Sequence, residues 1–345
     1  MVENDFEIDV IRSGTVILGP DVTCDGFHCN RDVRVQTHIH SDHMADFETS
    51  KGRVLVMSPC VRELLTFDHP DFEFRTNIRE LSAGDQFHYG NSTISIVAAG
   101  HMLGASQVLV VLDDGTRLGY SGDFSWPLDK VIKVDALVVD ATYGKPGSGY
   151  NYSQTEVEEK FVELSKKLLG NGPIHLMAHT AVIERALMIL STADIQDSVP
   201  IIANRKLCAS IKVHQKYGWP IDEPICVDTK DGHNALANGR YVRCWQLSEG
   251  GRVDGIVEGS TVKLSKYRAE QPVMQYGDQA YRCGLSAHAD FAGTLEYVEK
   301  SGAQYVVTDN CRGRNDRGRI LANVLSNELG IKCRPSSNAR VHKWG

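Results

Sequence analysis

The most informative segment of the chain reads Thr37-His38-Ile39-His40-Ser41-Asp42-His43, and it directly follows an apolar, strand-like run. Alternate residues of an extended segment share one face, so the rings of His38 and His40 should point at the same spot. Asp42 and His43, in the turn that follows, can reach a second point nearby. Imidazole nitrogen and carboxylate oxygen are ligands suited to zinc. The segment therefore predicts a metal site rather than a solvated histidine-rich loop.

The composition of the 345-residue chain is that of a globular protein. Apolar residues make up 42% and charged residues 23%, which excludes a disordered or collagen-like chain. No apolar run reaches the ~18 residues that a transmembrane helix needs. The acidic start at residues 1–5 lacks the features of a secretory signal. We therefore expect a cytoplasmic protein without a membrane partner.

The charge balance limits the kind of nucleic-acid binding that the chain could perform. Lysine plus arginine number 37 and aspartate plus glutamate 44, giving a net charge of −7. This balance argues against broad electrostatic binding of the histone kind. It does not exclude a nuclease, because bound metal ions neutralise the carboxylates of a metal site.

The cysteines are an odd set of nine with no CxxC pair, which predicts reduced thiols in a cytosol-like compartment. Cys24 and Cys29 flank His28, but no second cysteine pair exists to complete a metal knuckle.

The pattern along the chain predicts an α/β fold with an insertion. Short strand-like runs fill the first part of the chain, for example at 93–98, 107–112 and 136–140. After a loop at 144–149, Ser153 and Glu156 form a capping box that opens a helix running to about 169. Strands and helices then alternate, and from about 281 the tail returns to a βαβα pattern. We place an inserted α/β domain at 144–265, between outer parts at 1–143 and 266–345.

The spacing His-x-His-x-Asp-His at 38–43 resembles the signature of the metallo-β-lactamase fold, an αββα sandwich that holds one or two metals at one edge. The resemblance implies further ligands downstream, and the chain offers His101, Asp123 and His288 in the expected order. By this resemblance, Asp123 bridges two ions. The first ion also takes His38, His40 and His101, and the second also takes Asp42, His43 and His288.

The residues around these ligands are similar to those of the β-CASP nucleases. The motifs that carry the resemblance are Gly-His-Met-Leu-Gly-Ala at 100–105, Gly-Asp-Phe-Ser at 122–125, Asp-Ala-Thr-Tyr-Gly at 140–144 and Ser-Ala-His-Ala-Asp at 286–290. This branch includes the endonuclease subunit of the cleavage and polyadenylation complex, ribonuclease J and Artemis-like nucleases. It carries an α/β domain inserted in the second half of the metal domain, where this chain has its predicted insertion.

Two departures from the β-CASP pattern favour a shorter relative. The segment 261–267 lacks the histidine that serves the family as general acid, and Thr308-Asp309-Asn310 replaces a late His-Gly. The short exonuclease-like proteins associated with ligase and helicase operons resemble the chain better in length and in their compact insert. The general acid is left open between a metal-bound water, His179 and His233, although both histidines also fit ordinary structural positions.

The resemblance implies a metal-dependent nuclease acting on DNA or RNA, most simply an exonuclease on single-stranded ends. Two zinc ions, with manganese as the alternative, would share a hydroxide that attacks phosphorus in line. Asp42 would orient the hydroxide, and Asp140 would hold a histidine ring through its free N–H. Repair or processing proteins are the expected partners. The alternatives are a small-molecule metallo-hydrolase, such as a lactonase or thioesterase, and a non-catalytic scaffold in a processing complex.

Other residues admit both a role in nucleic-acid binding and an ordinary structural role. Four arginines at 312–319 could form a phosphate-binding edge or a solvated helix start. Several aromatic side chains could stack bases or fill cores: Tyr150, Trp126, Trp219 and Trp245.

Overall fold

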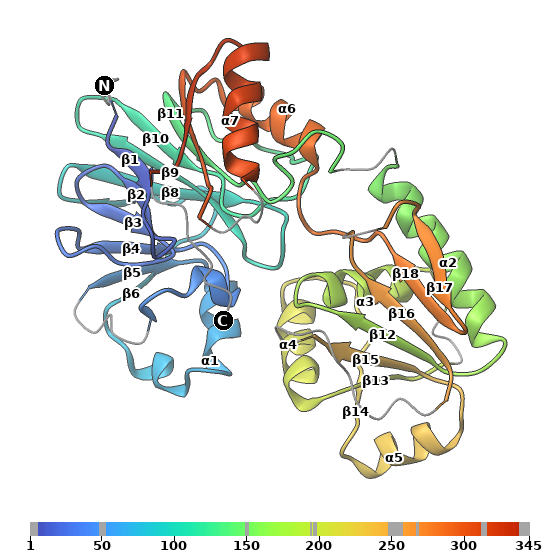
Figure 1. Cartoon of the computed structure of the whole chain (residues 1–345). Helices are drawn as coiled ribbons and strands as arrows, with labels where there is room; N and C mark the ends of the chain where they lie inside the picture. Colours follow the sequence, from blue (N-terminus) through green and yellow to red (C-terminus); the bar gives the residue numbers. More distant parts are fainter. Residues whose placement is uncertain are drawn as a thin grey trace, which may run out of the picture. The chain divides into compact units, whose positions relative to one another are not determined.

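The structure is a computed structural model that describes residues 6–47, 53–148, 152–193, 195, 199–247, 258–266, 269–311 and 316–337. Over these residues the fold is mixed α/β, with seven α-helices and three multi-stranded sheets (Figure 1). The chain divides into two compact units, the first formed by 1–148 and 288–345 and the second by 149–287. No helix in the described ranges has the length and apolar character needed to cross a membrane.

The first unit contains two sheets. One has the order β1-β2-β3-β4-β5-β6, and the other has the order β20-β19-β11-β10-β9-β8-β7. The strands of the first sheet are β1 (Ile8–Val10), β2 (Val16–Leu18), β3 (Val22–Cys24), β4 (Val33–Gln36), β5 (Val54–Met57) and β6 (Ile78–Glu80). Those of the second are β7 (Phe87–Tyr89), β8 (Ser92–Ala98), β9 (Ser106–Leu112), β10 (Arg117–Tyr120), β11 (Ala136–Val139), β19 (Tyr305–Thr308) and β20 (Lys332–Pro335).

One apolar core joins these two sheets. Val35 and Val56 of the first sheet pack in the same cluster as Val108 and Val138 of the second. Successive side chains of a strand point to opposite faces, so Leu55 of β5 faces away from this core. It packs instead in a cluster with residues of α1 (Pro59–Thr66). The unit also contains α6 (Phe291–Ser301) and α7 (Arg317–Glu328).

The second unit is a seven-stranded sheet with four helices. Its order is β14-β13-β15-β12-β16-β18-β17, and neighbouring strands are parallel except β17 with β18. The strands are β12 (Ile174–Ala178), β13 (Ile201–Ala203), β14 (Ile225–Cys226), β15 (Val242–Gln246), β16 (Ser260–Leu264), β17 (Val273–Gly277) and β18 (Ala280–Cys283). The helices are α2 (Gln154–Leu169), α3 (Val182–Thr192), α4 (Arg205–Lys216) and α5 (Lys230–Ala237).

The predicted start of α2 is confirmed in the structure. The Ser153 hydroxyl accepts a hydrogen bond from the backbone N–H of Glu156 at 3.1 Å, which satisfies one of the N–H groups that a helix start leaves without a partner.

The predicted end of the insertion at 265 differs from the structure. Residues 266–287, which the sequence analysis gives to the outer domain, belong to the second unit. The reason is strand pairing, because β18 pairs in parallel with β16 and β17 closes the sheet beside it. Residues 144–148, by contrast, lie in the first unit. The antiparallel strands β17 and β18 are short and lie well beyond the last helix of the insertion, so the sequence pattern did not assign them to the inserted domain.

Candidate metal centre

The histidine segment leaves the end of β4 and continues into a short 3-10 turn at Ser41–His43. His38 is fully buried and His40 is half-buried. Their ring centroids lie 4.8 Å apart, as the alternation of an extended segment predicts. The backbone of β4 thus directs both imidazoles to one place.

Two tight turns bring His101 and Asp123 close to the rings of His38 and His40. Gly100 and Gly122 precede them with φ of +69° and +57°, a region that side chains with a Cβ rarely adopt. A Cβ at Gly100 would lie 2.3 Å from the Ser125 hydroxyl oxygen, and one at Gly122 would lie 2.5 Å from a backbone oxygen. Both turns therefore need glycine directly before the candidate ligand.

Four side chains converge into one candidate ion site. His38, His40, His101 and Asp123 each offer a ligand atom, and these atoms all lie within 4.8 Å of one another. His101 Nε2 is 3.1 Å from His40 Nδ1, and His38 Nε2 is 3.6 Å from Asp123 Oδ2. Three imidazoles and one carboxylate are a donor set suited to a divalent transition metal.

Asp123 also faces the remaining histidines. Its Oδ1 lies 3.3 Å from His43 Nε2, and its Oδ2 lies 4.0 Å from His288 Nδ1. Burial alone would raise the pKa of the Asp123 carboxyl, but the surrounding imidazoles, led by His43, hold it well below its usual value. The carboxylate is therefore ionised at the centre of the histidine cluster.

The protonation of His38 suits a metal ligand. Burial, followed by the nearby charge of His43, lowers the pKa of His38 well below its usual value, so its ring is neutral. Thr37 Oγ1 lies 2.9 Å from its Nδ1. Its Nε2 is buried with no hydrogen-bond partner among the described residues. A buried polar atom without a partner is costly, and a metal ion at this position would satisfy it.

Asp140 and His288 form a second group with Asp123. The Asp140 Oδ2 lies 3.2 Å from His288 Nδ1. Its Oδ1 accepts hydrogen bonds from the backbone and hydroxyl of Thr142, both at 2.7 Å, which fix the carboxylate. Burial tends to lower the pKa of His288, but Asp140 and Asp123 outweigh it and raise that pKa.

Asp42 lies beside the cluster rather than within it. Its side chain is 50% exposed, and its Oδ2 is 3.9 Å from His43 Nε2. It belongs to none of the ligand groups found among the described residues. The structure therefore brings together His38, His40, His43, His101, Asp123, Asp140 and His288, with Asp42 at their solvent side.

Asp25, which was not predicted from the sequence, is fully buried under the histidine segment. Its Oδ2 accepts a hydrogen bond from His43 Nδ1 at 2.7 Å, and its Oδ1 accepts one from the backbone N–H of Thr37 at 2.8 Å. A carboxylate only accepts, so His43 carries its proton on Nδ1 and turns Nε2 toward Asp123. A carboxylate behind a histidine is a common support for metal ligands.

A signal for Asp25 was present in the sequence. It follows β3, which pairs in parallel with β4, so the carboxyl ends of the two strands lie at the same edge of the sheet. An acidic residue directly after a strand that neighbours β4 was therefore a candidate to reach the histidine segment.

The other residues singled out in the sequence have varied positions. In the first unit, Arg317 donates a hydrogen bond to the backbone oxygen of Thr142, and its guanidinium carbon lies 5.9 Å from the centre of the Tyr143 ring. Arg319 pairs with Asp316 at 2.8 Å. His179 and His233 are exposed in the second unit. Arg312, Arg314 and Tyr150 lie outside the described residues.

The tryptophans have structural contacts of their own. Trp126 donates to Glu296 at 3.2 Å, Trp245 donates to His175 at 3.1 Å, and Trp219 packs edge-on against His214.

The fold and the histidine cluster together define an α/β protein with a candidate metal centre in its first unit. No family model matches the chain. The "uncharacterized protein in lig 3'region" of Acidianus ambivalens is 34% identical over 140 residues, which cover 40% of this chain and 98% of that protein. The chain therefore belongs to the same family as this archaeal protein.

One solved structure extends the comparison to the fold. The crystal structure of a protein of unknown function from Enterococcus faecalis V583 matches with a TM-score of 0.53 at 14% identity. The match covers 80% of this chain and 74% of that one. At this identity the likeness shows a shared fold alone.

Proposed function

We propose that this chain is a metal-dependent nuclease of the metallo-β-lactamase fold, with a short β-CASP-like insertion. The observation that carries the proposal is the cluster around Asp123, where a buried carboxylate faces four histidine rings. The two sheets with a common core and the α/β unit inserted between 148 and 288 support the same reading of the fold.

The residues would divide between two ions, for which zinc is the first choice and manganese the alternative. Asp123 would contact both ions, the first also held by His38, His40 and His101, and the second also held by His43 and His288. The resemblance adds Asp42 to the second ion, and its Oδ2 lies 3.9 Å from His43 Nε2 at the solvent side. When bound, such ions supply Lewis acidity toward a phosphoryl group and lower the pKa of water toward neutrality.

The residues of the chain have the supporting tasks. Asp25 orients His43 so that its Nε2 faces Asp123, and Asp140 holds the Nδ1 of His288, which also lies toward Asp123. Asp42 stands at the solvent side with half of its carboxylate exposed, where it can accept a hydrogen bond from an incoming water. These roles correspond to the two carboxylates, Asp42 and Asp140, that the sequence assigns to catalysis.

The family relationship favours DNA as the substrate. The name of the Acidianus ambivalens relative places that protein in the 3′ region of lig. A nuclease that trims DNA ends would serve the same processes as a ligase. We therefore propose single-stranded DNA ends as the main substrate, single-stranded RNA as the second, and repair or processing proteins as partners.

The test is incubation of the purified protein with labelled single- and double-stranded DNA and RNA, each with either end blocked. We expect metal-dependent shortening of single strands from one end and slow cleavage of circular single strands. Asp123→Asn should abolish cleavage, whereas Asp32→Asn, an exposed carboxylate of the same unit, should leave it unchanged.

Three other outcomes would replace all or part of the proposal. Hydrolysis of lactones or thioesters without any cleavage of polynucleotides would show a small-molecule hydrolase. A fully metal-loaded protein that hydrolyses neither class would indicate a scaffold. Circular strands cut as fast as linear ones would replace the exonuclease by an endonuclease.

A further inference from the structure

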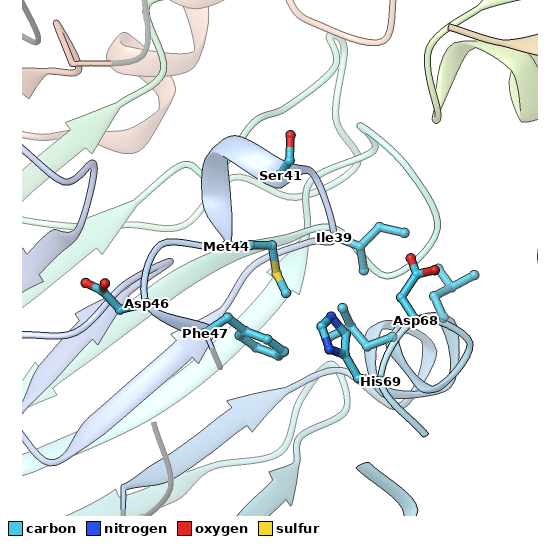
Figure 2. A pocket seen from close by; sticks show the side chains of 9 residues that line it. Ile39, Ser41, Met44, Asp46, Phe47, Asp68 and His69 are labelled. Atoms are coloured by element: carbon cyan, nitrogen blue, oxygen red, sulfur yellow. The ribbon is translucent and has the colours of Figure 1, made fainter. Parts of the chain in front are cut away.

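A pocket of about 400 Å³ lies beside the histidine segment in the first unit (Figure 2). Ile39, which stands between two candidate ligands, and Met44, which follows the 3-10 turn, belong to its lining. Because side chains of an extended segment alternate, Ile39 points away from the face that His38 and His40 share. The pocket and the candidate metal centre are therefore built on opposite faces of one segment.

The inner wall of the pocket is apolar and aromatic. Phe47 is 3% exposed and stacks on Phe72 with ring centroids 5.1 Å apart and planes 17° apart. The half-buried His69 ring lies 5.3 Å from Phe47, and Figure 2 shows both rings on the pocket side. Packed rings of this kind offer a flat, pre-formed surface to a planar ligand.

The rim of the pocket is acidic. Asp46 and Asp68 are exposed lining residues, and the lining residues that the structure describes include no lysine or arginine. A carboxylate has about four lone-pair sites, so Asp68 can accept N–H donors of a ligand in addition to its contacts within the protein.

Exposed aromatic side chains continue from the pocket along the same segment. Phe67 is 46% exposed and directly precedes Asp68, and Phe74 is 79% exposed at the end of the following 3-10 turn, Pro70–Phe74. Large apolar side chains are costly to expose, and aromatic faces on a surface stack the bases of single strands. Stacking surfaces thus lie next to a pocket that accepts N–H donors.

We propose that this pocket binds a nucleobase with an exocyclic amino group, that is adenine, cytosine or guanine rather than thymine or uracil, from a single-stranded substrate. The assignment rests on the proposed nuclease function. The amino groups at adenine N6, cytosine N4 and guanine N2 donate to carboxylates such as Asp68, whereas uracil and thymine have no amino group and their O4 atom is an acceptor that the carboxylate repels. Phe67 and Phe74 then stack the bases that follow.

Binding of free deoxynucleosides tests the pocket without any cleavage. Deoxyadenosine, deoxycytidine and thymidine are titrated into the intact protein, and binding is followed by ligand-observed NMR or calorimetry. We expect saturable binding of the first two and binding of thymidine weaker by about tenfold. Asp68→Asn should weaken deoxyadenosine binding by about tenfold as well.

Glu73→Gln is the matched control, because Glu73 is an exposed acid of the same segment that does not line the pocket. It should bind each nucleoside as the unaltered protein does. Equal binding of all three nucleosides, no saturable binding, or no effect of Asp68→Asn would overturn the assignment. Strand cleavage without nucleoside binding would overturn the pocket alone, and nucleoside binding without cleavage would overturn the nuclease proposal alone.

Discussion

Two carboxylates, those of Asp25 and Asp140, orient histidine rings of the candidate metal centre. Asp25 is fully buried and holds the Nδ1–H of His43 at 2.7 Å, while Asp140 holds His288 at 3.2 Å. The resemblance pointed to Asp140, whereas Asp25 was not among the residues predicted from the sequence. Their influence on the metal therefore passes through the histidine ring that each of them fixes.

We expect Asp25→Asn to lower metal affinity by about 10- to 100-fold, because an amide holds the His43 ring less firmly and does not favour its Nδ1–H form. Zinc competition with a chromophoric chelator measures the affinity. Asp32→Asn, in the same unit but exposed and paired with Arg53, is the control and should bind zinc as before. Unchanged affinity in Asp25→Asn would remove Asp25 from the support of the site.

Asp123→Ala should reduce metal content more than His288→Ala. The Asp123 carboxylate lies within 4.0 Å of nitrogens of His38, His43, His101 and His288, whereas His288 directs its Nδ1 at two carboxylates, Asp123 and Asp140. Elemental analysis after gentle purification gives the metal content of each variant. Equal losses in the two variants would argue against a central role for Asp123.

At the scale of elements, the turn after β10 determines where Asp123 stands. Gly122 has a φ of +57°, and a Cβ there would lie 2.5 Å from the backbone oxygen of Ser106. We expect Gly122→Ala to lower the free energy of unfolding by more than about 1 kcal/mol and to weaken metal binding as well. Denaturant unfolding and the zinc competition assay measure the two effects.

Gly115→Ala is the control for steric crowding, since Gly115 also has a positive φ but a Cβ there meets nothing within 4 Å. It should cost stability through backbone strain and leave metal affinity unchanged. A Gly122→Ala variant that binds zinc normally would contradict the role of this turn.

The start of helix α3 should make the second unit sensitive to pH. Glu184 is fully buried, and its carboxylate accepts a hydrogen bond from the backbone N–H of Ala181 at 2.7 Å. Burial raises the pKa of Glu184 from 4.5 to about 7. Between these values the folded state keeps a proton that the unfolded state has released, so the free energy of unfolding falls as the pH rises through this window.

We expect the loss from Glu184 between pH 4.5 and 7 to be about 3 kcal/mol, with little further change above pH 7. Denaturant unfolding at a series of pH values from 4.5 to 8 measures it. Glu184→Gln has no proton to release and should show a smaller loss over this range. The same pH profile in Glu184→Gln and the unaltered chain would show that another group is responsible.

At the scale of the whole molecule, the candidate metal ligands and the inserted sheet belong to different units. Every candidate ligand lies in the first unit, while the second has its own apolar core built around β12 and helices α2 to α4. A ligand that binds only the folded state stabilises the part of the chain that contains its site. Metal should therefore act on one unit selectively.

We expect two calorimetric unfolding transitions in the metal-loaded protein, of which a chelator lowers only one. Hydrogen exchange with mass spectrometry identifies the sensitive part, and peptides of the first unit should lose protection while those from 154–247 keep it. Loss of protection across both units, or no change in either, would contradict this division.

Local patterns in the sequence determined those features of this protein that depend only on residues close together in the chain. The alternation of His38 and His40 after a strand fixed their common direction, and the capping residues Ser153 and Glu156 fixed the start of α2. The mixed α/β class followed from the same periodicities. Each of these features is set by backbone geometry over a few residues, so a single sequence carries it.

Only the tertiary structure decided which distant residues meet. Asp25 reaches His43 because β3 and β4 pair in parallel, and residues 266–287 join the second unit because β18 pairs with β16. The pocket likewise combines the histidine segment with residues of α1 and the turn after it. Strand pairing and helix packing join segments that are far apart in the chain, and no local pattern specifies those partners.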